Sequence, residues 1–279
     1  MVLKSYAKIN LLLKINRKMI NGLHDIQSIF CLVNLFDTID IRRIKNKFKD
    51  EIYFKGPYSK HVKESNNSIK KILIIMRKRK LISDYYRINV IKKIPVFAGL
   101  GGGTSNAATI FKFLVKKKIN KKDLDKIVDY IGSDFRLFLQ RQGFLKNLKS
   151  VIPFNKKYKF YFLIVYPKIK CSTKKIYSRV KTFSIKDILP LNKLNNWNFL
   201  LNYITYSNND LQLIVEKKYP IIGKLLFDIS IEKGCYFSKM TGSGSACYGL
   251  FINEKSSKAA LKSLRKKYPK FWFSIAKTI

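Results

Sequence analysis

Apolar and polar residues alternate along much of the first half of the chain. In residues 7–15 every second side chain is apolar, from Ala7 to Ile15, and Leu12 is the exception to the alternation. This period of two predicts a half-buried strand. The same period predicts strands at residues 37–44 and 86–94.

Other segments carry apolar residues at helical spacing. Residues 67–80 predict a helix, and Asn66, Asn67 and Ser68 are residue types that cap helices. Further helices are predicted at residues 106–116, 123–131, 197–203, 210–216 and 255–267.

The second half opens with a strongly apolar strand at residues 158–166, which ends at Pro167. The pattern changes near residue 155, and it predicts two domains, residues 1–155 and 156–279. Strands, a strand–loop–helix unit and later helices together predict an α+β fold.

Composition indicates a folded chain. The 279 residues are 47% hydrophobic and 14% aromatic, which excludes a disordered protein. No apolar run approaches the roughly 20 residues of a membrane-spanning helix, and lysines interrupt the apolar stretches near Met1. We therefore expect a cytoplasmic protein with no membrane partner.

The formal net charge is +40. A basic face could attract nucleic acid or anionic substrates. The lysines, however, are spread along the whole chain, which is rich in Lys, Ile and Asn. The charge is therefore read as compositional, and a nucleic-acid partner is not expected.

Metal and redox motifs are missing from the sequence. The four cysteines are far apart, and the chain has only two histidines. A zinc cage or a redox pair is not expected, and the cysteines are predicted to be reduced and mostly buried thiols.

The segment from Pro95 to Ala108 is the most informative one, because a strand runs into it and a helix runs out. Its four glycines let the backbone approach a ligand closely and adopt positive φ. Backbone N–H groups and a helix N-terminus can then bind an anion. Thr104 and Ser105 add hydroxyls for a phosphate or a phosphate-bound metal ion. We predict a phosphate-binding loop.

Two familiar phosphate loops do not fit this spacing. A Walker A loop needs Gly-Lys before Ser or Thr, and no lysine lies there. A dinucleotide fingerprint that starts at Gly99 would need glycine where Thr104 stands. Two structural alternatives remain: a plain tight turn, or glycines that allow close helix packing.

This loop closely resembles the phosphate loop of the GHMP kinases, and other parts of the chain match the family in the same order. The matching segments are Ala7-Lys8-Ile9-Asn10-Leu11, Asn21-Gly22-Leu23-His24, Gly132-Ser133-Asp134, Asn209-Asp210-Leu211 and residues 240–247. The triple glycine before Ser-Asn-Ala-Ala is most similar to members that phosphorylate a cytidine diphosphate sugar alcohol in the non-mevalonate isoprenoid pathway.

The resemblance implies a two-domain GHMP kinase fold. Its N-terminal half would be like ribosomal protein S5 domain 2, and its C-terminal half would be ferredoxin-like. It also implies ATP and Mg²⁺ as cofactors, with the metal ligands unassigned. The residues that would bind ATP are Pro95, Val96, Phe97, Ala98, Gly99, Leu100, Gly101, Gly102, Gly103, Thr104 and Ser105.

The resemblance also implies roles in catalysis and acceptor binding. Asp134 falls on the catalytic base that accepts the proton of the acceptor hydroxyl, and Lys8 on the lysine that orients it. The acceptor would be a small molecule held by Asn10, His24, Thr173 and Tyr177. Tyr177 would stack on its cytosine ring, and His24 would hydrogen-bond the edge of that ring.

Three departures from the family pattern keep alternatives open. Leu23 replaces a tyrosine that stacks on the base, Phe135-Arg136 replaces Val-Pro, and residues 143–153 form a shortened stretch. A GHMP kinase for homoserine or a mevalonate derivative is the nearest alternative. A basic nucleic-acid-binding protein that has lost kinase activity is the other.

Overall fold

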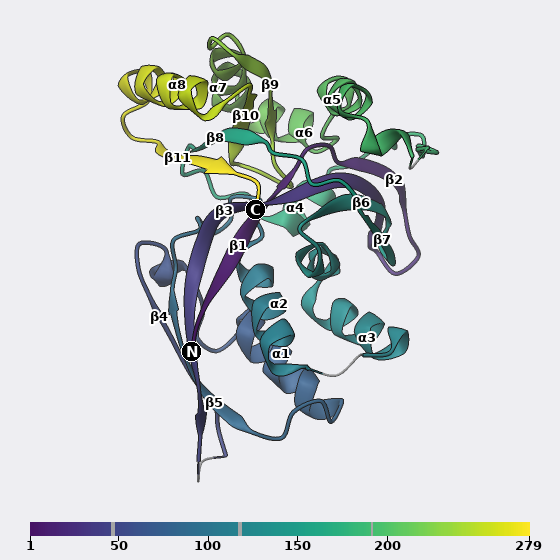
Figure 1. Ribbon diagram of the computed structural model, residues 1–279, viewed down its shortest axis with the longest axis vertical. Coiled ribbons are helices and arrows are strands. Elements are labelled where there is room, and N and C mark those ends of the chain that lie inside the picture. Colours follow the sequence, from purple (N-terminus) through teal and green to yellow (C-terminus); the bar gives the residue numbers. More distant parts are fainter. Residues whose placement is uncertain (46–47, 117–118, 191) are drawn as a thin grey trace. The chain divides into compact units, whose positions relative to one another are not determined.

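The structure is a computed structural model that describes residues 1–45, 48–116, 119–190 and 192–279 (Figure 1). It contains two compact units that interleave along the chain. Unit 1 comprises Met1–Lys8, Leu35–Val96 and Gly101–Gln140, and unit 2 comprises Ile9–Asn34, Phe97–Leu100 and Arg141–Ile279. The chain thus passes between the units four times before Gln140 and once after it. The domain boundary after residue 155 stays a prediction.

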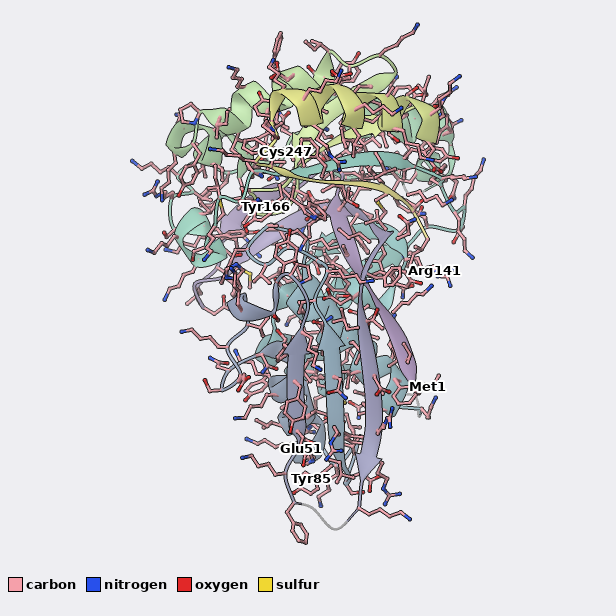
Figure 2. All side chains as sticks on the ribbon, turned by 90° about the vertical axis from the view of Figure 1, so that its left-hand side faces the viewer. Met1, Glu51, Tyr85, Arg141, Tyr166 and Cys247 are labelled. Atoms are coloured by element: carbon pink, nitrogen blue, oxygen red, sulfur yellow. The ribbon has the colours of Figure 1, made fainter. Side chains whose placement is uncertain are left out.

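Unit 1 combines a sheet with helices. Within it, β4 (Glu51–Lys55) pairs in parallel with β5 (Tyr85–Ile91), which pairs antiparallel with the later part of β3 (His24–Ile44). β1 (Val2–Asn10) also pairs with β3. Glu51 and Tyr85, which begin β4 and β5, lie near the same end of the sheet, as parallel strands require (Figure 2).

The helices of unit 1 start where the sequence offers caps. Asn67 accepts a hydrogen bond from the N–H of Lys70, and Asn120 accepts one from the N–H of Asp123. The helix predicted at residues 67–80 is confirmed, with Ile69, Ile72 and Met76 buried. The elements are η1 (Ser59–His61), α1 (Ser68–Lys78), α2 (Gly102–Leu114), α3 (Lys121–Ile131) and η2 (Ser133–Leu139).

Unit 2 contains a four-stranded antiparallel sheet in the order β11-β8-β10-β9. Helix α7 precedes β9 and packs on β9 and β10, while α8 follows β10 and packs on β8, β10 and β11. This is the βαββαβ connectivity of a ferredoxin-like fold, as expected. The elements are β8 (Tyr161–Tyr166), α7 (Ile221–Ser230), β9 (Cys235–Met240), β10 (Cys247–Phe251), α8 (Glu254–Lys267) and β11 (Trp272–Lys277).

The rest of unit 2 holds further strands and short helices. The early part of β3 pairs with β2 and β6, and β6 pairs with β7, so the stretch at residues 143–153 is a hairpin. The elements are β2 (Lys14–Lys18), β6 (Gln142–Asn147), β7 (Ser150–Pro153), α4 (Thr173–Tyr177), η3 (Lys193–Asn195), α5 (Trp197–Tyr206) and α6 (Gln212–Lys218).

One sequence prediction is wrong in part. The strand predicted at residues 7–15 is interrupted, because β1 ends at Asn10 and β2 begins at Lys14. Leu11, Leu12 and Leu13 are all buried, so they cannot alternate between two faces. The N–H groups of Leu11 and Leu12 both point to the carbonyl of Ile29, at 2.7 and 3.5 Å, which breaks the ladder.

Candidate active site

The second half of the glycine-rich loop belongs to unit 1 and opens helix α2. Gly101 is its N-cap residue, with φ of +70°, and no side chain caps the helix. A Cβ on Gly101 would lie 2.6 Å from Cζ of Phe138, so only glycine fits. The first N–H groups of α2 therefore lie beside backbone without Cβ atoms, as an anion site requires.

The two hydroxyls of the loop differ in their surroundings. Ser105 is buried, and its Oγ donates to the carbonyl of Tyr6 at 2.6 Å and lies 2.8 Å from Oγ of Ser5. Thr104 stays half-buried. Thr104 is therefore the loop hydroxyl available for a ligand, while that of Ser105 fixes the helix to β1.

The first half of the loop belongs to unit 2. Gly99 has φ of +77°, and a Cβ there would lie 2.1 Å from the carbonyl oxygen of Thr241. The N–H of Ala246 donates to the carbonyl of Ala98 at 3.1 Å. The turn between β9 and β10, which lies in the family-matching segment 240–247, thus packs directly on this half of the loop.

Asn209 holds the backbone of that turn by hydrogen bonds. Its Nδ2 donates to the carbonyls of Met240 and Gly242, both at 2.8 Å, and the residue is buried. The Asn-Asp-Leu segment therefore has a definite structural task, which is to fix the backbone of the turn.

The segment ahead of the glycines is mostly packed into the protein. Pro95 and Ala98 are buried and Val96 is half-buried. Phe97 is the exception, since it is 48% exposed and has φ of +60°. Such a conformation is uncommon for a bulky residue and is often found at functional sites.

Lys8 and Asp134 lie together in unit 1. Lys8 comes from β1 and Asp134 from the start of η2, and Lys8 Nζ lies 3.5 Å from Asp134 Oδ2. The side chain of Lys8 is 3% exposed, whereas that of Asp134 is 38% exposed. A buried ammonium thus holds a carboxylate that is open to an incoming ligand.

An aromatic cluster in unit 2 surrounds His24. The ring of His24 lies 5.2 Å from that of Tyr177 and 6.4 Å from that of Phe183, between centroids. Burial, with a smaller effect of Lys18, lowers the pKa of His24 below its usual 6.5. The imidazole is therefore neutral at pH 7, with one donor and one acceptor nitrogen.

Phe183 is a residue that sequence reasoning missed. It lies in irregular chain after α4, so no periodicity marks it. Leu23, in contrast, is 49% exposed. Phe183 thus places an aromatic ring beside His24, whereas position 23 offers none.

The two other predicted acceptor residues are tied to neighbouring segments of unit 2. Asn10 is buried, its N–H donates to Oγ1 of Thr241 at 3.1 Å, and its Nδ2 donates to Oγ of Ser28 at 2.8 Å. Oγ1 of Thr173, at the start of α4, lies 2.9 Å from Oγ of Ser243. Thr173 thus contacts the family-matching segment at residues 240–247.

Neither a metal cage nor a membrane segment is found in the part of the chain that the structure describes. Over residues 1–45, 48–116, 119–190 and 192–279, no three His, Cys, Asp or Glu side chains are grouped to hold a metal ion. Over the same residues, no helix is both long and apolar enough to span a bilayer.

Comparison with known proteins identifies the protein family to which the chain belongs. The family model for the N-terminal domain of GHMP kinases matches residues 67–136, and that for the C-terminal part matches residues 184–270. This chain belongs to the GHMP kinase family and is a small-molecule kinase.

Individual relatives narrow the class. A 4-diphosphocytidyl-2-C-methyl-D-erythritol kinase of Pelagibacter ubique is 36% identical over 99% of this chain and 98% of its own length. A kinase of the same name from Caldanaerobacter subterraneus is 30% identical over 99% of this chain and 96% of its own length. A crystal structure of 4-(cytidine 5'-diphospho)-2C-methyl-D-erythritol kinase has the same fold, with a TM-score of 0.74, 21% identity and 99% of each chain covered.

More distant members share the fold as well. A homoserine kinase from Cytophaga hutchinsonii superposes with a TM-score of 0.64 at 15% identity, over 100% of this chain and 94% of its own. The two-domain GHMP kinase fold expected from the sequence is thereby confirmed.

Proposed function

We propose that this chain transfers the γ-phosphate of ATP to the 2-hydroxyl of 4-diphosphocytidyl-2-C-methyl-D-erythritol, in the non-mevalonate route to isoprenoid precursors. The full-length relatives of that name support the substrate. The observation that carries the chemistry is the contact between the buried Lys8 ammonium and the exposed Asp134 carboxylate.

Asp134 acts as the general base. Its carboxylate accepts the proton of the acceptor hydroxyl as the hydroxyl oxygen bonds to the γ-phosphorus and the bond to the β-phosphate oxygen breaks. Lys8 holds Asp134 and the hydroxyl in position. Most of the rate gain in such a transfer comes from positioning and charge stabilisation. The Asp134 carboxylate and the Lys8 ammonium supply both.

The glycine loop binds the phosphates of ATP. The residues from Pro95 to Ser105 fit a triphosphate, because α2 starts without a side-chain cap and a Cβ on Gly101 would fill the close approach. Mg²⁺ neutralises charge on the phosphates when bound. A phosphate-bound Mg²⁺ needs few protein ligands, and the hydroxyl of Thr104 is the loop group suited to it.

The cluster around His24 recognises the cytosine. A neutral imidazole can hydrogen-bond the edge of a base, and the ring of Tyr177 offers a stacking face. Phe183 adds a second ring beside His24. Asn10 and Thr173 complete the set, and their contacts to residues 241 and 243 hold them in place.

The test is turnover with identified product. The purified protein, ATP and Mg²⁺ are incubated with 4-diphosphocytidyl-2-C-methyl-D-erythritol, homoserine or mevalonate, and ³¹P NMR locates the new phosphoester. We expect ADP release only with the cytidine compound and phosphate on its 2-hydroxyl. Faster turnover of homoserine or mevalonate would replace this proposal with the alternative acceptor.

A further inference from the structure

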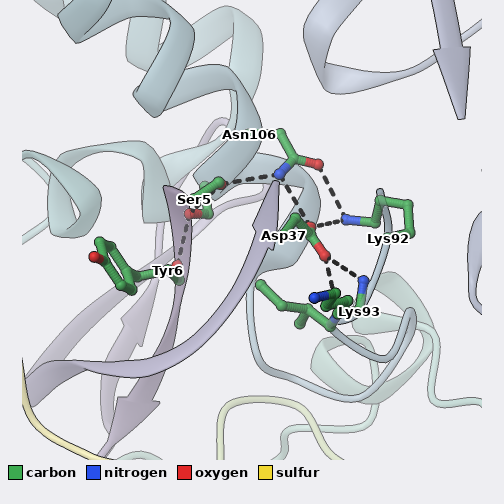
Figure 3. A network of polar contacts seen from close by, with 8 residues as sticks. Ser5, Tyr6, Asp37, Lys92, Lys93 and Asn106 are labelled. Atoms are coloured by element: carbon green, nitrogen blue, oxygen red, sulfur yellow. Dashed lines mark hydrogen bonds and ion pairs between the residues drawn. The ribbon is translucent and has the colours of Figure 1, made fainter. Parts of the chain in front are cut away.

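A buried polar network in unit 1 connects the residues just before Pro95 with the residue just after Ser105, at the two ends of the glycine-rich segment (Figure 3). Lys92 follows β5, Asp37 lies in β3, Ser5 in β1 and Asn106 in α2. Each of the four is at most 2% exposed. Four polar groups in the core require mutual satisfaction, since an unpaired one would be costly.

The contacts form a closed ring. Lys92 Nζ makes an ion pair with Asp37 and donates to Oδ1 of Asn106 at 3.0 Å. Nδ2 of Asn106 donates to Oδ2 of Asp37 at 3.0 Å and to Oγ of Ser5 at 2.9 Å. Lys92 and Asp37 thus hold Asn106 from both ends of its amide.

The same carboxylate holds the chain just before the loop. Oδ1 of Asp37 accepts the N–H groups of Lys93 and Ile94, at 2.7 and 2.9 Å. These residues immediately precede Pro95, and Asn106 immediately follows Ser105. Asp37 therefore fixes both ends of the segment from 95 to 105, whose glycines have no side chains to fix themselves.

The ion pair lies directly against the loop backbone. A Cβ on Gly102 would lie 3.3 Å from Lys92 Nζ and 3.0 Å from Cγ2 of Ile94. The first turn of α2 thus packs closely against the side chains of Lys92 and Ile94.

Strand periodicity shows that these polar residues occupy core positions. Lys92 continues the buried row of Ile88 and Val90, and Asp37 begins the buried row of Ile39 and Ile41. A buried ion pair is weak evidence for stability, since apolar residues at such positions are often at least as stable. A role in positioning accounts for polar residues there.

The pair adds little net charge to the loop. Burial lowers the pKa of the Lys92 ammonium, and the Asp37 carboxylate beside it opposes this shift. The two opposite charges neutralise each other, so the network acts on a bound phosphate by fixing the backbone rather than by its own field.

We propose that Lys92, Asp37 and Asn106, here called the loop clamp, are positioning residues that hold the phosphate loop in its ATP-binding conformation. This inference rests on the proposed function of that loop. A loop displaced by the loss of its clamp presents its N–H groups at the wrong distance from the phosphates, which weakens nucleotide binding and leaves acceptor binding unaffected.

The test compares variants in nucleotide affinity and in the two Michaelis constants. Asn106→Ala keeps the ion pair and releases the arm after the loop, and Lys92→Met/Asp37→Asn removes both charges together so that neither is left unpaired. The affinity for a non-hydrolysable ATP analogue is measured by calorimetry, and KM by ADP release. We expect a loss of affinity and a rise in KM for ATP of about 10–100-fold, with KM for the acceptor unchanged.

Asp50→Asn is the matched control. In the same unit, the Asp50 carboxylate also pairs with a cation and accepts a backbone N–H. Arg77 Nη1 and Nη2 donate to it at 2.7 and 2.6 Å, and the N–H of Tyr86 donates at 2.9 Å. Nucleotide affinity of this control should equal that of the wild type. Thermal unfolding establishes that each variant is folded.

Two results would overturn the loop clamp. One is wild-type nucleotide affinity in folded Asn106→Ala and in the folded double variant, and the other is an equal loss in Asp50→Asn. The ATP analogue is titrated without acceptor. If the acceptor is wrong, the proposed function fails, but the nucleotide affinities of the variants still test the loop clamp.

Discussion

At the scale of single residues, the site depends on polar groups whose neighbours set their chemistry. Lys8 and Asp134 differ strongly in exposure, at 3% and 38%, although they lie 3.5 Å apart. In the proposed mechanism this asymmetry suits each group to one task, because the buried Lys8 ammonium can orient the carboxylate and the exposed Asp134 can receive the proton of the acceptor. His24 follows the same logic, with two rings beside it and its pKa lowered chiefly by burial.

His24 makes acceptor binding pH-dependent on the acid side. Burial lowers the pKa of His24 below 6.5, so the imidazole becomes protonated, and loses its acceptor nitrogen, with a midpoint below that pH. KM for the acceptor should rise as the pH falls, with an inflection below pH 6.5, as measured in initial-rate assays. His24→Gln should show a raised KM without this acid rise. An inflection above pH 6.5 in the wild type would contradict the assignment.

At the scale of elements, the loop is built by the strand-to-helix junction around it. The helix predicted at residues 106–116 in fact begins at Gly102, because glycines that are poor helix formers are held there by packing against Phe138, Lys8, Ile94 and Lys92. Sequence propensity alone could not show this, since the contacts come from β1, η2 and the segment that follows β5.

Gly101→Ala should abolish most nucleotide binding. The residue has φ of +70°, and its new Cβ would lie 2.6 Å from the Phe138 ring and 3.2 Å from Cγ of Lys8. A shifted loop and a displaced Lys8 should lower kcat/KM for ATP by about 100-fold, measured by ADP release. Gly223→Ala in α7 is the control, since its nearest neighbour is Glu216 at 3.7 Å and its rate should not change. Wild-type kinetics in Gly101→Ala would contradict the loop assignment.

Periodicity and caps predicted some elements well and others not at all. Helix α1 was predictable because Asn67 is followed by a clean amphipathic pattern. Helix α7 was missed, because Ile221–Ser230 is apolar on most sides and has no capping side chain. The loop clamp was also missed, although Lys92 in phase with Ile88 and Val90 was a signal for a buried polar group.

At the scale of the whole molecule, the site unites residues distant in sequence, and no local pattern can predict such pairs. Lys8 and Asp134 on their own read as a strand lysine and a turn aspartate, and only resemblance to a family linked them. The structure brings these two together and, separately, His24 and Tyr177. The roles of these residues and a cytoplasmic location stay predictions.

The charge of +40 should have little effect on turnover. Its lysines and arginines are spread along the chain, and at about 0.15 M salt a Debye length of about 8 Å screens exposed charges from one another. Added RNA should therefore leave the rate of ADP release unchanged at this salt concentration. Tight RNA binding with loss of turnover would support a nucleic-acid function instead.

The most direct test of the central claim is the turnover of Asp134→Asn with 4-diphosphocytidyl-2-C-methyl-D-erythritol. Asparagine keeps the size of the side chain and cannot accept the proton, so kcat should fall by at least about 100-fold. Affinity for the ATP analogue should be retained, and Asp129→Asn, an exposed change on α3, should behave as wild type. Undiminished kcat in Asp134→Asn would contradict the account of this site.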